Sequence, residues 1–198
     1  MDVLVAEALR LLDDEGFAAL TTRRLAARLG IHQPRIYRRI ADREELLELV
    51  SDAIMAEVRL PQSSLAPREW LLQAGLELRR TWGRHPHAAP LLHFGGARPA
   101  ISEFLDRVVS VLHAAGLQDD RLLAALQAFL GYVFGVVVLE GRSGVQRAPA
   151  PVEASSFPEL HHLQQLVATA SAGTGEARFE QGLQLVLNGM FDAATAGG

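Results

Sequence analysis

The chain has 198 residues, of which 49% are hydrophobic and 21% charged, and it contains no cysteine. This hydrophobic content suits one or two compact domains and excludes a disordered chain, while the missing cysteine excludes a disulfide framework, a thiolate zinc site and a cysteine nucleophile. The first residues run directly into a periodic acidic segment, without the basic and short apolar stretches of a secretory signal. We therefore expect a cytoplasmic protein.

The net charge of −4 conceals an uneven distribution of charge along the chain. All 19 basic residues are arginine, and seven of them lie between Thr21 and Arg43 with a single acid, Asp42. That window carries +6 and the remaining chain carries −10. A single positive segment on an acidic protein favours a local, oriented contact with a polyanion, and a solvated helix face is the alternative.

Hydrophobic spacing predicts an all-α chain, because no strand pattern of comparable length occurs. Gly16 and Gly30 are expected to end the first two helices, and Pro34 is accepted in the first turn of the third. The expected helices cover residues 2–15, 23–29, 33–40, 43–58, 68–84, 88–93, 101–115, 121–140, 157–172 and 176–194.

Two segments without apolar periodicity indicate how the chain is divided. The run 60–67 is rich in Pro and Ser and indicates a connection between a small amino-terminal domain and a larger one. The domains are predicted at residues 1–48 and 49–198. Residues 141–156, rich in Gly, Pro and Ser, predict a connecting loop.

The basic segment has the pattern of a helix-turn-helix. Ala26 is small where two helices would cross, Gly30 permits a positive φ in the turn, and Ile36 fills the wedge between the helices. The outward positions then hold hydrogen-bond donors, a flat ring and cations, which suit a nucleic-acid surface. Because glutamine can bond adenine and arginine can bond guanine in the major groove, Gln33 and Arg35 are predicted to read base edges.

The other outward residues are expected to face the DNA backbone. Thr22 would cap toward it and Arg23 could reach either bases or phosphates, and the residues expected along the phosphates are Tyr37, Arg38, Arg39 and Arg43. The alternative for Tyr37 is core packing beside Ile36. For Arg39 and Arg43 the alternative is an ion pair with Glu44 or Glu45.

The stretch from Leu20 to Val50, LTTRRLAARLGIHQPRIYRRIADREELLELV, resembles the DNA-binding motif of TetR-family transcriptional repressors, and especially the tetracycline-repressor branch. Weaker similarity continues through His85-Pro86 and residues 157–160 and 179–190. The resemblance implies an all-helical homodimer of about nine to ten helices per chain, with an amino-terminal three-helix DNA-binding domain and a larger ligand-binding and dimerisation domain. Its expected partner is palindromic double-stranded operator DNA.

The branch's DNA contacts, carried over by position, fall on Thr22, Arg23, Gln33, Pro34, Arg35, Tyr37, Arg38, Arg39 and Arg43. The branch usually has an aromatic residue and then a histidine where this chain has Arg38 and Arg39, and a small hydroxyl residue at Arg35. The operator sequence therefore cannot be carried over.

Residues 122–139 are apolar apart from Gln127 and are long enough to cross a membrane. The segment lacks an aromatic belt and a basic flank, so we expect no membrane contact but a helix buried between its own core and a second subunit. Glycines four residues apart would let a partner helix approach closely. The predicted homodimer interface comprises Gly131, Gly135, Val138, Leu183, Leu187 and Met190.

The resemblance also implies a small-molecule effector that lowers DNA affinity by changing the separation of the two recognition helices. The many apolar and aromatic residues of the larger domain predict an apolar effector, although each could instead be core. The pocket candidates are Trp70, Leu78, Trp82, Leu91, His93, Phe94, Leu105, Phe129 and Tyr132.

No metal site or cofactor is expected. The segment 93–99, HFGGARP, is similar to the branch's magnesium-holding segment, and Glu140 falls near that site's acidic residue. However, Ala97 replaces the threonine that follows the histidine there, and the spacing of the remaining histidines does not suit shared coordination. A magnesium-tetracycline ligand is therefore not the predicted effector.

No catalytic pattern competes with this interpretation. Ser143 fails the nucleophile-elbow pattern, and no glycine-rich phosphate cradle or metal-binding histidine-glutamate motif is present. The predicted function is a DNA-binding transcriptional regulator, a repressor released by an effector. The alternatives are an architectural DNA-binding protein without an inducer and a small helical enzyme.

Overall fold

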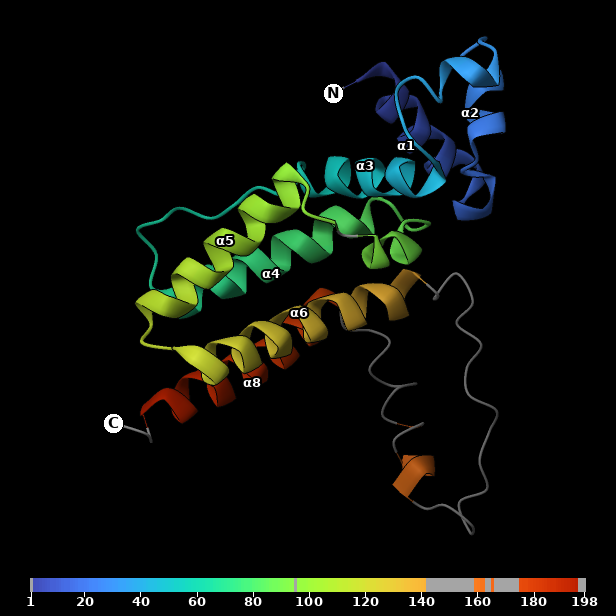
Figure 1. The fold of residues 1–198 in the computed structure, drawn as a ribbon. Coiled ribbons are helices and arrows are strands. Elements are labelled where there is room, and N and C mark those ends of the chain that lie inside the picture. The colour runs from blue at the N-terminus through green and yellow to red at the C-terminus, as the bar shows by residue number, and fades with distance from the viewer. Residues whose placement is uncertain (1, 95, 142–158, 163–164, 166–174, 196–198) are drawn as a thin grey trace.

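The computed structural model describes residues 2–94, 96–141, 159–162, 165 and 175–195, and the regular structure in these ranges is helical (Figure 1). The all-α prediction is thereby confirmed. Residues 142–156 of the predicted loop and most of the predicted helix 157–172 lie outside the described residues. The α-helices are α1 (Val3–Glu15), α2 (Thr22–Arg28), α3 (Arg43–Met55), α4 (Pro67–Gly83), α5 (Pro99–Ala114), α6 (Asp119–Gly141) and α8 (Gly175–Thr195). The 3-10 helices are η1 (Phe17–Ala19), η2 (Gln33–Arg35) and η3 (Ala89–His93).

The amino-terminal helices form a small head at one end of the molecule (Figure 1). Thr21 caps α2, because its hydroxyl accepts a hydrogen bond from the Arg24 amide at 3.3 Å. Gly30 adopts a φ of 64° in the turn that follows. Ala26 and Ile36 are buried between the helices, as the helix-turn-helix pattern predicts.

The recognition segment is shorter than predicted. Instead of an α-helix over 33–40, it contains the single 3-10 turn of η2, followed by hydrogen-bonded turn residues. The amides of Ile36 and Arg39 bond the carbonyls three residues earlier, at 3.0 and 2.8 Å, which tightens the backbone.

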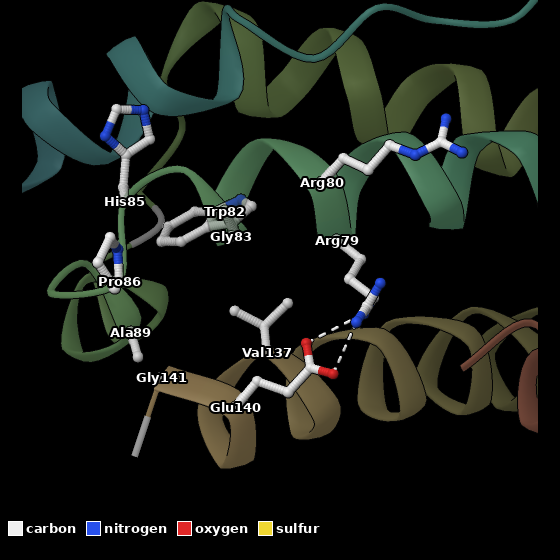
Figure 2. Close-up of a pocket in the computed structure, with 10 residues that line it drawn as sticks. All are labelled: Arg79, Arg80, Trp82, Gly83, His85, Pro86, Ala89, Val137, Glu140 and Gly141. Carbon is white, nitrogen blue, oxygen red and sulfur yellow. Dashed lines mark hydrogen bonds and ion pairs between the residues drawn. The ribbon is translucent and has the colours of Figure 1, made fainter. Parts of the chain in front are cut away.

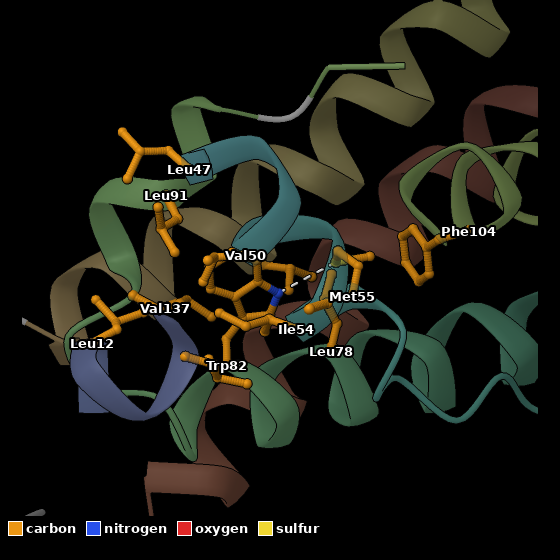
Figure 3. Close-up of a cluster of buried hydrophobic side chains, with 14 of the residues drawn as sticks. Leu12, Leu47, Val50, Ile54, Met55, Leu78, Trp82, Leu91, Phe104 and Val137 are labelled. Carbon is orange, nitrogen blue, oxygen red and sulfur yellow. Dashed lines mark hydrogen bonds between the residues drawn. The ribbon is translucent and has the colours of Figure 1, made fainter. Parts of the chain in front are cut away.

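Helix α3 connects the head to the rest of the chain. It ends at Met55, three residues before the predicted end, and runs through the predicted domain boundary at 48/49. It packs against α1 on one side and against α4, η3 and α5 on the other. Figure 3 shows this junction, where Leu12, Ile54 and Trp82 gather from three helices. The head is therefore seated on the larger domain through a shared apolar core.

The larger domain packs α6 and α8 beside each other against α4 (Figure 1). One stripe of α6 buries Ala125, Phe129, Val133 and Val137, spaced four residues apart, in the core. The opposite side is open, with Leu123 and Leu139 exposed by 51% and 65%. Length and composition alone would allow α6 to cross a membrane, with a mean hydropathy of 2.3. Here α6 packs as one layer of a helical domain.

The predicted interface residues divide between two environments. A Cβ atom added at Gly131 or Gly135 would meet no described atom within 4 Å, so both glycines face open space. Leu183, Leu187 and Met190 are buried in the core of their own chain. The open side of α8 instead carries Leu185, which is 72% exposed. Val138 is partly exposed.

Candidate nucleic-acid interface and ligand pocket

Three arginines of the head project into solvent. Arg23 is exposed in the first turn of α2, and Arg35 and Arg38 are exposed on the recognition segment. None of them forms an ion pair or a side-chain hydrogen bond with the described residues, whereas four other arginines of the same window do. Unpaired guanidinium groups keep their donors available for phosphate oxygens and for guanine edges.

The remaining arginines of the window are held within the head. Arg28 reaches Glu7 and Asp14 at 2.7 and 2.8 Å, and Arg24 reaches Glu15 at 2.7 Å. Hydrogen bonds to Asp14 and Glu7 raise the pKa of Arg28 above its ordinary value. These pairs fasten α2 to α1, so these arginines stabilise the head.

Two predicted phosphate contacts have partners that the sequence did not indicate. Arg39 pairs with Asp2 at 2.7 Å, not with Glu44 or Glu45. Arg43 donates a hydrogen bond from Nε to the carbonyl of Leu20 at 3.1 Å, and its guanidinium lies 5.3 Å from the centre of the Phe17 ring. Arg39 therefore forms an ion pair, as the alternative predicted, but with a different acid. For Arg43 the ion-pair alternative is wrong.

A polar cluster joins the start of α2 to the recognition segment. Gln33 Nε2 donates to Thr22 Oγ1 at 3.0 Å, and the Thr22 and Tyr37 hydroxyls are 3.1 Å apart. Thr22 is buried, and Thr21, not Thr22, caps α2. Tyr37 is 49% exposed, so its core-packing alternative is wrong. The cluster fixes Gln33 and Tyr37 at the edge of the exposed surface, and Pro34 is exposed beside them.

A pocket of about 290 Å³ lies where the ends of α4 and α6 meet the loop before η3 (Figure 2). Arg79 crosses it and forms two hydrogen bonds to Glu140, at 3.0 and 2.8 Å. The Arg79 guanidinium also stacks 5.2 Å from the centre of the Phe179 ring. The described lining residues are Arg79, Arg80, Trp82, Gly83, His85, Pro86, Ala89, Val137, Glu140 and Gly141. The pocket thus combines apolar walls with one ion pair.

Of the predicted pocket candidates, only Trp82 is among these lining residues. Four candidates belong to the continuous hydrophobic core and are fully or almost fully buried, namely Trp70, Leu78, Leu91 and Phe129. Phe94 stacks on Phe17 of the head at 6.5 Å, and Leu105 is partly buried on α5. Tyr132 donates to the carbonyl of Phe179 at 2.9 Å, and burial raises the pKa of its phenol more than Arg79 lowers it.

The histidine and acidic residue singled out by sequence similarity do not meet. His93 is exposed on η3 and does not line the pocket, while Glu140 is engaged by Arg79. In the described ranges, no group of three histidine, aspartate or glutamate side chains is placed to hold a metal ion.

The head exposes unpaired arginines, and α3 joins it to a helical domain with a pocket. This combination defines a DNA-binding transcriptional regulator rather than an enzyme. Residues 4–50 match the family model for bacterial regulatory proteins of the tetR family, and residues 61–193 match the model for the tetracyclin repressor-like C-terminal domain. The chain belongs to the TetR family, as its sequence resemblance predicts.

Relatives in this family cover nearly the whole chain. An HTH-type transcriptional regulator of Saccharopolyspora erythraea is 34% identical, over 99% of this chain and 85% of the relative. The class E tetracycline repressor of Escherichia coli is 29% identical, over 96% of this chain and 89% of the relative.

Solved structures share the fold. Apo ActR of Streptomyces coelicolor has a TM-score of 0.83 at 26% identity, covering 98% of this chain and 96% of ActR, and ActR in complex with (S)-DNPA has a TM-score of 0.78 at 25% identity, with 96% of each chain covered. BioQ bound to its double-stranded DNA operator has a TM-score of 0.72 at 28% identity, with 96% of each chain covered.

Proposed function

We propose that this regulator is a cytoplasmic repressor that binds a palindromic operator as a homodimer and is released by a small-molecule effector. The observation that carries the proposal is the set of arginines without an ion-pair partner among the described residues, Arg23, Arg35 and Arg38, on an exposed helix-turn-helix. The structure of BioQ with its operator and that of ActR with (S)-DNPA support the two kinds of partner.

Sequence reading is assigned to Gln33 and Arg35, at the start of the recognition segment. The Gln33 amide is held by Thr22 through its nitrogen at 3.0 Å, which restricts its orientation before DNA arrives. Arg35 has no competing partner among the described residues and can form a bidentate pair with guanine. Arg23 and Arg38 supply phosphate contacts that orient the head on the duplex.

The homodimer is assigned to the open side of α6 and α8. The exposed leucines there, Leu123, Leu139 and Leu185, would be covered in a four-helix contact. Gly131 and Gly135 leave space for the partner helix. A two-fold axis through this contact would present two heads to one face of DNA, so the operator is palindromic.

The effector is assigned to the pocket between α4 and α6. About 290 Å³ between Trp82, Pro86 and Val137 suits a small molecule with an apolar body, and the Arg79–Glu140 pair offers both a donor and an acceptor to a polar group. Binding there would lower DNA affinity by a coupling free energy of about 1–3 kcal/mol.

Selection of bound sequences from a random duplex pool tests the DNA-binding proposal. We expect enrichment of a palindrome with half-site centres about one helical turn apart. Gln33→Ala should weaken binding to the selected duplex by about 1–3 kcal/mol and leave binding to random DNA unchanged, while Arg39→Ala should weaken both equally. Equal losses for Gln33→Ala on both duplexes would contradict its base-reading role.

A further inference from the structure

His85 links the pocket wall to the head. Its ring is almost completely buried, and it follows α4 at the edge of the pocket, near Trp82 and Pro86 (Figure 2). Its Nδ1 lies 2.9 and 3.0 Å from the two carboxylate oxygens of Asp13, in α1 of the head. Its Nε2 lies 3.4 Å from Oε2 of Glu57, just beyond the end of α3. One side chain thus links the pocket edge to α1 and to the segment that directly follows α3.

The His85 clasp, formed by the contacts with Asp13 and Glu57, joins one imidazole ring to two carboxylates. Carboxylate oxygens only accept hydrogen bonds, so a ring N–H is the donor in these contacts. Burial opposes ionisation of Glu57, but hydrogen bonds from Arg84 and His85 outweigh it and hold the pKa of Glu57 below its ordinary value. The clasp is therefore a hydrogen-bonded contact at the edge of the core.

We infer that His85 is the positioning residue that couples occupation of the pocket to the orientation of the DNA-binding head. This inference rests on the proposed function, because it concerns how the effector and DNA sites communicate. A ligand that shifts the loop at His85 and Pro86 must move or break the contact to Asp13, and Asp13 belongs to the helix against which α2 is fastened. By linkage, DNA bound to the head changes the pocket through the same contact.

A second contact between the pocket and α3 provides the competing route. The indole N–H of Trp82 donates to Met55 Sδ at 3.4 Å, inside the core shown in Figure 3. Met55 is the last residue of α3 and reaches the head through that helix. The two routes can be separated, because His85 can be changed without touching Trp82 or Met55.

The reciprocal direction of the coupling gives a test that needs no effector. The chain has two tryptophans, Trp82 in the pocket wall and Trp70 away from it, so full-length protein labelled with 5-fluorotryptophan gives two fluorine resonances. The probe is the duplex recovered by the selection experiment, and Trp70→Phe assigns the signals. In the unsubstituted protein, saturation with duplex should shift the Trp82 resonance and leave that of Trp70 in place.

Substitutions at His85 then test its contacts with Asp13 and Glu57 separately. His85→Phe keeps a buried ring without donors, and we expect the Trp82 shift to disappear while the duplex still binds. His85→Asn keeps a donor where Nδ1 faces Asp13, so it should retain most of the shift. His85→Gln keeps a donor where Nε2 faces Glu57, so it should lose most of it. His87→Asn, two residues away and exposed, is the matched control and should behave as the unsubstituted protein does.

The outcomes separate this inference from the proposed function. If His85→Phe retains the full Trp82 shift, the inference is overturned. If His85→Phe does not fold, the comparison between His85→Asn and His85→Gln decides. A Trp82 shift of equal size in these two variants would overturn the role of Asp13. Failure of the unsubstituted protein to bind the duplex, measured by fluorescence anisotropy, contradicts the proposed function itself. Binding without any Trp82 shift overturns the coupling alone.

Discussion

The head and the open side of α6 and α8 leave opposite kinds of surface uncovered. In the head, Arg23, Arg35 and Arg38 project without acidic partners among the described residues, although acidic residues of α1 hold their neighbours. On α6 and α8, Leu139 and Leu185 are 65% and 72% exposed. Unpaired charge suits a polyanion, and uncovered apolar area suits another protein surface.

The largest expected effect comes from placing a charge on the apolar side. Leu185→Glu would bury an unpaired carboxylate in the proposed dimer, so the dimer dissociation constant should rise by about a hundredfold, or roughly 3 kcal/mol. Sedimentation equilibrium measures this. Val3→Glu in the head is the matched control, since Val3 is exposed by the same 72%. Equal dimer affinity in the two variants would remove α8 from the interface.

Removing a free arginine should weaken DNA binding and also reduce its dependence on salt. Arg38→Ala should lower affinity by about tenfold in about 0.1 M salt and reduce the slope of log K against log salt by about 0.9 for each phosphate that is no longer neutralised. Arg39→Ala should have a smaller effect, because Asp2 competes for that guanidinium. Anisotropy titrations at several salt concentrations measure the affinity and the salt slope of both variants. A larger loss of affinity in Arg39→Ala than in Arg38→Ala would contradict the distinction between arginines with and without acidic partners among the described residues.

Two glycines of the larger domain test how tightly its core is packed. A Cβ at Gly182 would lie 2.1 Å from the Tyr132 hydroxyl oxygen, which is fixed by its bond to Phe179. Gly182→Ala should therefore lower the free energy of unfolding by about 1–3 kcal/mol. Gly83→Ala, where no described atom lies within 4 Å, should leave it unchanged or raise it slightly. Chemical denaturation measures both, and equal effects would contradict the packing of α8 on α6.

The smallest expected effect is a pH dependence within the head. Hydrogen bonds from Arg10 and Arg28 hold the pKa of Glu7 below its ordinary value of 4.5, against the opposing effect of desolvation. Its contribution to stability is therefore complete above about pH 5 and is lost as pH falls through the lowered pKa. Thermal unfolding of Glu7→Gln should depend less on pH below about 5 than that of Glu103→Gln, and parallel profiles would count against the role of Glu7.

The sequence predicts the helices and the helix-turn-helix because both depend on local spacing. Ala26, Gly30 and Ile36 occupy their expected places, since the turn and the wedge need those residue types. The recognition segment is less regular than predicted because hydrogen bonds that span three residues, from the amides of Ile36 and Arg39, are mixed with one that spans four, from the Ile40 amide to the Ile36 carbonyl. Local pattern alone does not distinguish these two kinds of turn.

The site is less predictable because its contacts join distant residues. Which arginines are free depends on acids of α1, such as Glu7, which lies 21 residues from Arg28. The pocket depends on Arg79 and Glu140, which are 61 residues apart. Aromatic content pointed to the pocket, but Trp70 and Phe129 lie in the buried core. Their hydrophobicity could not show whether they line a cavity or fill the interior.

The central claim is that the surface around Gln33, Arg35 and Arg38 enters the major groove of operator DNA. Methylation protection of guanine N7 on the selected duplex tests it most directly, because N7 lies in that groove. We predict two protected clusters centred about one helical turn apart, and loss of the guanine protection in Arg35→Ala. Tight binding with every guanine N7 still open to methylation would contradict the account.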